Sequence, residues 1–153
     1  MPIEDLQEQE KTKAPQDIPK AVLLIEDDIF VKDLYERTLT KRGYKVIVAE
    51  DGEEGVKKAN ENVEEIGLVL LDIMMPKLNG IEVLQKLMSN EKTKNLYVVL
   101  LTNLGQESII KEAFNIGAKG YMLKARLLPA QIADNIDEFF RTGIFPLHEP
   151  NGL

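Results

Sequence analysis

Short apolar segments alternate along this chain with longer segments in which apolar residues recur at helical spacing. The apolar segments have the length and the leucine and β-branched content that are typical of strands. They run from Ala21 to Ile25, Lys45 to Ala49, Leu68 to Leu71, Tyr97 to Leu101 and Gly120 to Leu123. The pattern therefore predicts five strands, each followed by a helix.

The first predicted helix places four apolar residues on one face, at the spacing i, i+3, i+4 and i+8. These residues are Val31, Leu34, Tyr35 and Leu39, and Gly43 follows where a C-cap glycine is expected. The other four helices are predicted at residues 52–60, 80–89, 106–116 and 128–141.

The third and fourth strands are apolar on both faces, as expected when helices cover both sides of a parallel sheet. Right-handed crossovers then give a doubly wound, flavodoxin-like α/β sheet with the strand order 2-1-3-4-5. We expect one domain over residues 20–142. Residues 1–19 contain three prolines and no sustained apolar period, which predicts a flexible N-terminal arm, and residues 143–153 are predicted to be a C-terminal tail.

Composition narrows the possible functions. A net charge of −7 argues against direct binding of nucleic acid, which needs clustered Lys and Arg. No apolar run approaches the roughly 20 residues that cross a bilayer, so no membrane association is expected. No secretory signal is visible, and the expected compartment is the cytoplasm. The chain has no cysteine and a single histidine, His148, so disulfides, thiolate zinc sites and multi-histidine metal sites are excluded.

Polar residues follow the predicted strands at the ends where doubly wound sheets bind their ligands. Glu26, Asp27 and Asp28 follow the first strand, Asp72 the third, Thr102 the fourth and Lys124 the fifth. Each could be an ordinary cap or surface residue, and we assign Asp28 to the N-cap of the first helix. The others converge on one edge from distant parts of the chain, which predicts a functional site.

These residue types suit phosphoryl transfer. Crowded carboxylates repel one another, and a hard cation such as Mg²⁺ relieves this repulsion. Asp72 would attack phosphorus as the nucleophile, while Lys124 and Thr102 would contact phosphoryl oxygens. Pro76 and Gly80 predict a constrained turn after Asp72, whose carbonyls are available to a metal.

The chain resembles the receiver domain of two-component response regulators over about residues 20 to 142. The resemblance rests on four segments: Leu24 to Asp28, Leu71 to Gly80, Leu101 with Thr102, and Gly117 to Lys124. It implies Asp72 as phosphoacceptor, Glu26 and Asp27 as metal-side acids, and the Met74 carbonyl as a further Mg²⁺ ligand. It also implies Thr102 as the switch hydroxyl, Lys124 as the phosphate partner, and Tyr121 as an aromatic that turns inward on activation.

Two positions depart from the family. Ala125 stands where the family usually has a proline after a cis peptide, and a non-proline cis bond costs about 3 kcal/mol. We therefore expect the loop to be either trans and rearranged, or strained. Asn103 stands where the family usually has a small residue after the switch hydroxyl, and it would narrow access to the phosphoryl group or alter the rate at which water reaches it.

The implied function is a phosphorelay switch. A histidine kinase or a histidine phosphotransfer protein would phosphorylate Asp72, and the surface of the fourth helix, fifth strand and fifth helix would then bind a downstream protein. No second domain is visible after Arg141, so the chain resembles a stand-alone receiver. An aspartyl-phosphate enzyme is disfavoured because Met74 stands where such enzymes have a second aspartate. A flavin- or nucleotide-binding module is disfavoured because no glycine-rich loop follows the first strand. The remaining alternative is a degenerate receiver that binds partners without phosphorylation.

Overall fold

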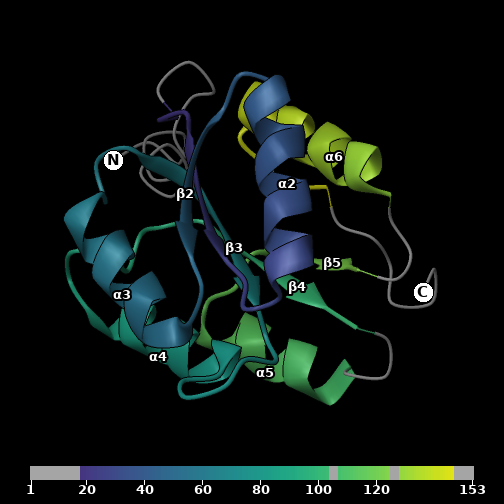
Figure 1. The fold of residues 1–153 in the computed structure, drawn as a ribbon. Helices are drawn as coiled ribbons and strands as arrows, with labels where there is room; N and C mark the ends of the chain where they lie inside the picture. The colour runs from purple at the N-terminus through teal and green to yellow at the C-terminus, as the bar shows by residue number, and fades with distance from the viewer. Residues whose placement is uncertain (1–17, 104–106, 125–127, 147–153) are drawn as a thin grey trace, which may run out of the picture.

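The computed structural model describes residues 18–103, 107–124 and 128–146. Five parallel strands form one sheet in the order β2-β1-β3-β4-β5 (Figure 1). They are β1 (Ala21–Ile25), β2 (Lys45–Ala49), β3 (Ile66–Asp72), β4 (Val98–Thr102) and β5 (Gly120–Leu123). The predicted fold class and strand order are confirmed.

Helices cover both faces of this sheet (Figure 1). They are α2 (Ile29–Lys41), α3 (Gly52–Glu61), α4 (Gly80–Ser89), α5 (Glu107–Ile116) and α6 (Pro129–Thr142). The buried residues form two clusters, one on each face of the sheet. One cluster contains residues of α2 and α6, and the other contains residues of α3, α4 and α5, so these helices pack on opposite faces. In β1, Leu23 joins one cluster and Leu24 the other, so a central strand is apolar on both faces.

The first helix differs in one respect from its predicted apolar face. Tyr35 and Leu39 are buried as expected, but Leu34 is 40% exposed. Helix α2 begins after Asp28, whose Oδ1 accepts hydrogen bonds from the amides of Phe30 and Val31 at 2.9 and 3.1 Å. The N-cap assignment of Asp28 is therefore confirmed.

Strands β3 and β4 each extend one residue further at the carboxyl end than the sequence predicts. Asp72 is the last residue of β3 and is paired with Leu101, and Thr102 is the last residue of β4 and is paired with Leu123. Both side chains are buried. The polar site residues thus belong to the rigid sheet, which fixes their positions more firmly than a loop would.

Residues at both ends of the described chain pack against the domain. Ile18, from the predicted arm, and Phe145, from the predicted tail, are buried in the same cluster as the residues of α6. The amide of Phe145 donates a hydrogen bond to the Tyr97 hydroxyl at 3.0 Å. Residues 1–17 of the arm and 147–153 of the tail, including His148, lie outside the described residues. Within the described ranges, the helices are too short or too polar to cross a bilayer.

Candidate phosphoryl-transfer site

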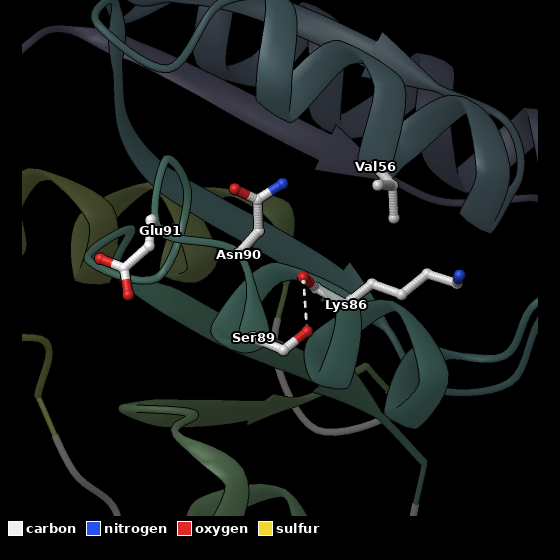
Figure 2. Close-up of a pocket in the computed structure, with 5 residues that line it drawn as sticks. All are labelled: Val56, Lys86, Ser89, Asn90 and Glu91. Atoms are coloured by element: carbon white, nitrogen blue, oxygen red, sulfur yellow. Dashed lines mark hydrogen bonds between the residues drawn. The ribbon is translucent and has the colours of Figure 1, made fainter.

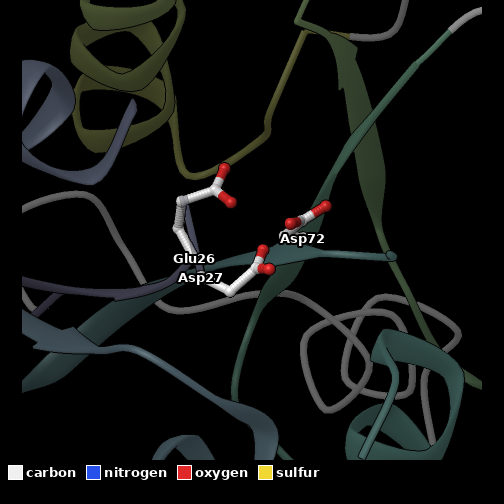
Figure 3. A group of neighbouring side chains, drawn as sticks. All are labelled: Glu26, Asp27 and Asp72. Atoms are coloured by element: carbon white, nitrogen blue, oxygen red, sulfur yellow. The ribbon is translucent and has the colours of Figure 1, made fainter. Parts of the chain in front are cut away.

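Three carboxylates meet at the carboxyl edge of the sheet. Glu26 and Asp27 follow β1, and Asp72 ends the neighbouring strand β3. One oxygen from each side chain lies within 4.8 Å of the others, and Figure 3 shows the group. Glu26 and Asp72 are buried and Asp27 is half-buried. The structure therefore brings together the three acids that the sequence proposes for a metal site.

Lys124 enters the same group from β5. Its amide donates a hydrogen bond to the carbonyl of Thr102 at 2.9 Å, which ties the two strand ends together. Its Nζ lies 2.6 Å from Glu26 Oε1 and 3.2 Å from Asp72 Oδ1. In this structure the ammonium is thus held by two of the three acids.

The charges in this group shift one another's pKa. Burial and the nearby Glu26 carboxyl raise the pKa of Asp72 to about 8, although Lys124 acts in the opposite direction. Burial alone would lower the pKa of Lys124, but contacts with Glu26 and Asp72 outweigh it, so that pKa is raised. Without a further cation, the group therefore favours a protonated Asp72 beside a charged lysine.

The loop after Asp72 is held close to it. The amide of Met74 donates to Asp72 Oδ1 at 3.2 Å, and the amide of Gly80 donates to the Ile73 carbonyl at 2.8 Å. A Cβ on Gly80 would lie 2.6 Å from the Asp72 carbonyl oxygen, so only glycine fits there without displacement. Asn79 caps α4 and exchanges hydrogen bonds with Glu82. The predicted turn is present, and its backbone is anchored at both ends.

The predicted switch residues lie in the sheet near this edge. Thr102 is 1% exposed, and its hydroxyl donates to the Asn103 carbonyl at 3.3 Å. Tyr121 is 4% exposed and packs edge-on against Phe114, with ring centroids 6.1 Å apart. Tyr121 therefore occupies a buried position in this structure. Ala125 lies outside the described residues.

The acidic group suits a hard divalent cation. All of its ligand atoms are carboxylate oxygens, which Mg²⁺ prefers. Glu26 Oε1 is buried, and the ammonium of Lys124 lies 2.6 Å from it. Three carboxylates therefore share this one ammonium, and a further cation would reduce their mutual repulsion. The donor set and its burial thus fit Mg²⁺.

The sequence pattern did not single out Tyr35 as a site residue. Burial raises the pKa of its phenol, and Lys124, Glu26 and Asp72 also act on it, so its hydroxyl lies within electrostatic reach of the acidic group. Its position on the apolar face of α2 identifies it only as a core residue. Tyr35 is therefore a buried residue whose phenol is coupled electrostatically to the acidic group.

A separate hollow lies between α3 and α4 and is distinct from the acidic group (Figure 2). It is lined by Val56, Lys86, Ser89, Asn90 and Glu91. Its polar side chains are engaged locally: Ser89 Oγ donates to the Lys86 carbonyl at 3.3 Å, and Asn90 Nδ2 to Asn60 Oδ1 at 3.2 Å. This hollow brings together no set of groups suited to catalysis.

Comparison with known proteins agrees with this geometry. A family model for the response regulator receiver domain matches residues 22–136. The chemotaxis protein CheY of Treponema pallidum is 40% identical over 111 residues, covering 72% of this chain and 76% of that protein. CheY of Thermotoga maritima is 30% identical over 120 residues, covering 78% and 96%. The chain also spans 42% of the Bacillus subtilis transcriptional regulatory protein PhoP, at 37% identity over 106 residues, which are 69% of this chain.

The fold matches solved structures of the same kind. The CheX-CheY-BeF3-Mg complex from Borrelia burgdorferi contains a chain with a TM-score of 0.71 and 32% identity, covering 84% of this chain and 98% of that one. The present chain belongs to the response regulator receiver family. Receiver domains of two-component systems are signalling switches that bind Mg²⁺ in an acidic pocket, and they are not enzymes that turn over external substrates.

Proposed function

We propose that this chain is a phosphorelay switch in which Asp72 accepts a phosphoryl group from a phosphohistidine. The donor is a histidine kinase or a histidine phosphotransfer protein, and the compartment is the cytoplasm. The observation that carries the proposal is the convergence of Glu26, Asp27 and Asp72, with ligand oxygens within 4.8 Å, around the ammonium of Lys124. Receiver-family membership supports the same chemistry.

The transfer is a displacement at phosphorus. A carboxylate oxygen of Asp72 forms the new P–O bond, the P–N bond to the donor imidazole breaks, and the imidazole nitrogen keeps the electron pair. The product is an acyl phosphate on Asp72. Lys124 then exchanges a carboxylate oxygen for a phosphoryl oxygen, and Thr102 donates its hydroxyl to another.

Mg²⁺ is the proposed cofactor. Glu26, Asp27 and Asp72 would hold it together with the backbone carbonyl of Met74. When bound, it neutralises charge on the carboxylates and on the transferred phosphoryl group. This chain's own contribution is to hold the Asp72 carboxyl group in position through the Met74 amide and the anchored loop, whereas a bound cation would keep that group ionised.

The proposed output is a change in the face formed by α5, β5 and α6, which would bind a downstream protein. Movement of Thr102 toward the phosphoryl group would open space beside Tyr121. Since Tyr121 is buried in this structure, the switch requires a second state in which the ring is more exposed. NMR chemical shifts of residues on this face, recorded before and after phosphorylation, test this mechanism. If Tyr121→Ala is phosphorylated at Asp72 and shows the same shift changes as the wild type, the mechanism is wrong.

The domain limits are also part of the proposal. A receiver domain over residues 20–142 is preceded by an arm over residues 1–19 and followed by a tail over residues 143–153. The burial of Ile18 and Phe145 extends the packed unit slightly beyond both limits.

The deciding experiment is incubation with Mg²⁺ and a small acyl-phosphate donor, followed by intact mass measurement. We expect an adduct of one phosphoryl group on the wild type that is absent in Asp72→Asn. Asp28→Asn is the matched control, because asparagine caps a helix as well as aspartate does, and it should retain the adduct. No adduct with any donor would instead favour the degenerate receiver, which binds partners without phosphorylation.

A further inference from the structure

A second hollow, of about 660 Å³, opens at the amino edge of the sheet, where β3, β4 and β5 begin. Apolar side chains line part of it, among them Met88, Leu96 and Phe139. Three lysines, Lys92, Lys94 and Lys119, also line this hollow. No described Asp or Glu is part of the lining. In a chain with a net charge of −7, such a lining is a local reversal of sign.

The lysines of this amino-edge hollow are only partly neutralised. Lys94 pairs with Glu91 at 2.8 Å. Lys92 and Lys119 are exposed and form no ion pair with any described residue. A concave, partly apolar surface with unpaired cations fits a segment that combines carboxylates with apolar side chains.

The N-terminal part of the chain enters the domain at this hollow. Ile18 and Pro19 form part of its lining. A Cβ on Gly67 would lie 2.0 Å from the Pro19 carbonyl oxygen and 2.8 Å from Ile18, so the chain crosses β3 in close contact at a glycine. The described part of the chain therefore begins at the rim of the hollow.

We propose that residues 3–10 of this chain occupy the amino-edge hollow. This acidic segment contains Glu4, Asp5, Glu8 and Glu10, has no basic residue, and carries the apolar Ile3 and Leu6. Its carboxylates would pair with Lys92 and Lys119, while its apolar residues would cover the half-buried side chains of Val63 and Met88. The hollow is thus a site for the chain's own N-terminal segment, on the edge of the sheet opposite Asp72.

The connection is long enough. Residues 11–17 span up to about 25 Å when extended, and the hollow begins at residue 18. Because the segment is tethered, its binding is intramolecular, with an effective concentration on the order of millimolar. Charge pairing at an exposed rim is screened by salt, so occupancy should fall as ionic strength rises.

The absence of native cysteines allows a direct test. A nitroxide is attached at Gln7→Cys, which keeps all four acids, and amide signals are recorded by NMR in the full chain. We expect broadening of residues 92–97 and 117–119, and loss of that broadening at high salt. The double substitution Lys92→Glu with Lys119→Glu should also abolish it.

The matched control is the double substitution Lys41→Glu with Lys111→Glu, at exposed positions outside the lining of the hollow. It changes the net charge by the same amount as the reversal of Lys92 and Lys119, and it should leave the broadening intact. No broadening in the wild type, or equal broadening after reversal of Lys92 and Lys119, overturns the proposal. So does broadening of the same amides by a nitroxide at Asn151→Cys but not at Gln7→Cys, because the C-terminal tail would then be the occupant.

Discussion

The ammonium of Lys124 lies 2.6 Å from Oε1 of Glu26 at the carboxyl edge of the sheet. Glu26 is fully buried, and this oxygen has no hydrogen-bond partner among the described residues. The ion pair therefore compensates a charge that would otherwise be costly to bury. Because the same lysine is the proposed phosphate partner, phosphorylation requires it to change partners.

Removing the lysine should destabilise the domain when no metal is present. Lys124→Met keeps most of the side-chain volume but leaves the buried Glu26 carboxylate without a nearby cation, which should cost about 3 kcal/mol in the free energy of unfolding. Urea unfolding in a chelating buffer measures this loss. Lys111→Met, at an exposed position, is the control and should be nearly neutral. Mg²⁺ should narrow the difference; equal stability of Lys124→Met and wild type without Mg²⁺ would contradict the ion-pair role.

Stability in metal-free buffer should depend on pH through Asp72. Its pKa in the folded protein is about 8, above its ordinary value of 3.8, so the folded state binds the proton more tightly than the unfolded state does. The stability from this proton is complete below about pH 4 and is lost as pH rises toward 8. Relative to Asp72→Asn, wild-type stability should fall by more than about 1 kcal/mol across this range. Unfolding curves at several pH values test this, with Glu64→Gln as an exposed control; parallel wild-type and Asp72→Asn profiles would show that Asp72 is not responsible.

Mg²⁺ should stabilise the wild type in proportion to its binding. Each tenfold rise in concentration above Kd adds about 1.4 kcal/mol, because only the folded state presents the three acids together. Thermal unfolding across a Mg²⁺ series measures the effect. Asp27→Asn should abolish most of it, while the neighbouring Asp28→Asn should retain it and keep the helix cap. An undiminished response in Asp27→Asn would place the metal elsewhere.

Gly80→Ala should weaken the site through the backbone. The new Cβ would lie 2.6 Å from both the Asp72 carbonyl oxygen and Ile73 Cα, so the loop must move. We expect a loss of about 1 to 3 kcal/mol in stability and a weaker Mg²⁺ response. Ile81→Ala, one residue further along α4, removes apolar contacts without this overlap. Ile81→Ala should lower stability while leaving Mg²⁺ affinity unchanged. If Gly80→Ala and Ile81→Ala weaken Mg²⁺ binding equally, the anchored loop is not the cause of the weaker binding.

A polar cluster joins α6 to the turn between α2 and β2. Asp137 accepts hydrogen bonds from the Tyr44 hydroxyl and Arg42 Nη1, each at 2.5 Å, whereas Asp134 accepts one from Arg42 Nη1 at 2.9 Å. Asp137→Ala should cost about 1 to 2 kcal/mol, because the half-buried Tyr44 hydroxyl loses its partner. Asp134→Ala removes only an exposed contact and should cost less than about 0.5 kcal/mol. Chemical denaturation compares the two, and equal losses would argue against a special role for Tyr44.

Much of this arrangement follows from local sequence patterns. The alternation of strands and helices and the order of the sheet were predicted because hydrophobic periodicity is set by neighbouring residues. Glu26, Asp27, Asp72 and Lys124 could be placed at one edge because parallel strands end on the same side. The carboxyl ends of β3 and β4 were each predicted one residue too early, since Asp72 and Thr102 are polar yet complete the ladder with Leu101 and Leu123.

The sequence by itself determined the fold class, the edge that carries the site and the types of group it contains. Only the tertiary structure decided that Lys124 pairs most closely with Glu26, that burial raises the pKa of Asp72, and that Ile18 and Phe145 join the core. These features depend on distances between residues far apart in the chain and on the water excluded around them. No local pattern encodes such distances, so they became known only once the elements were packed together.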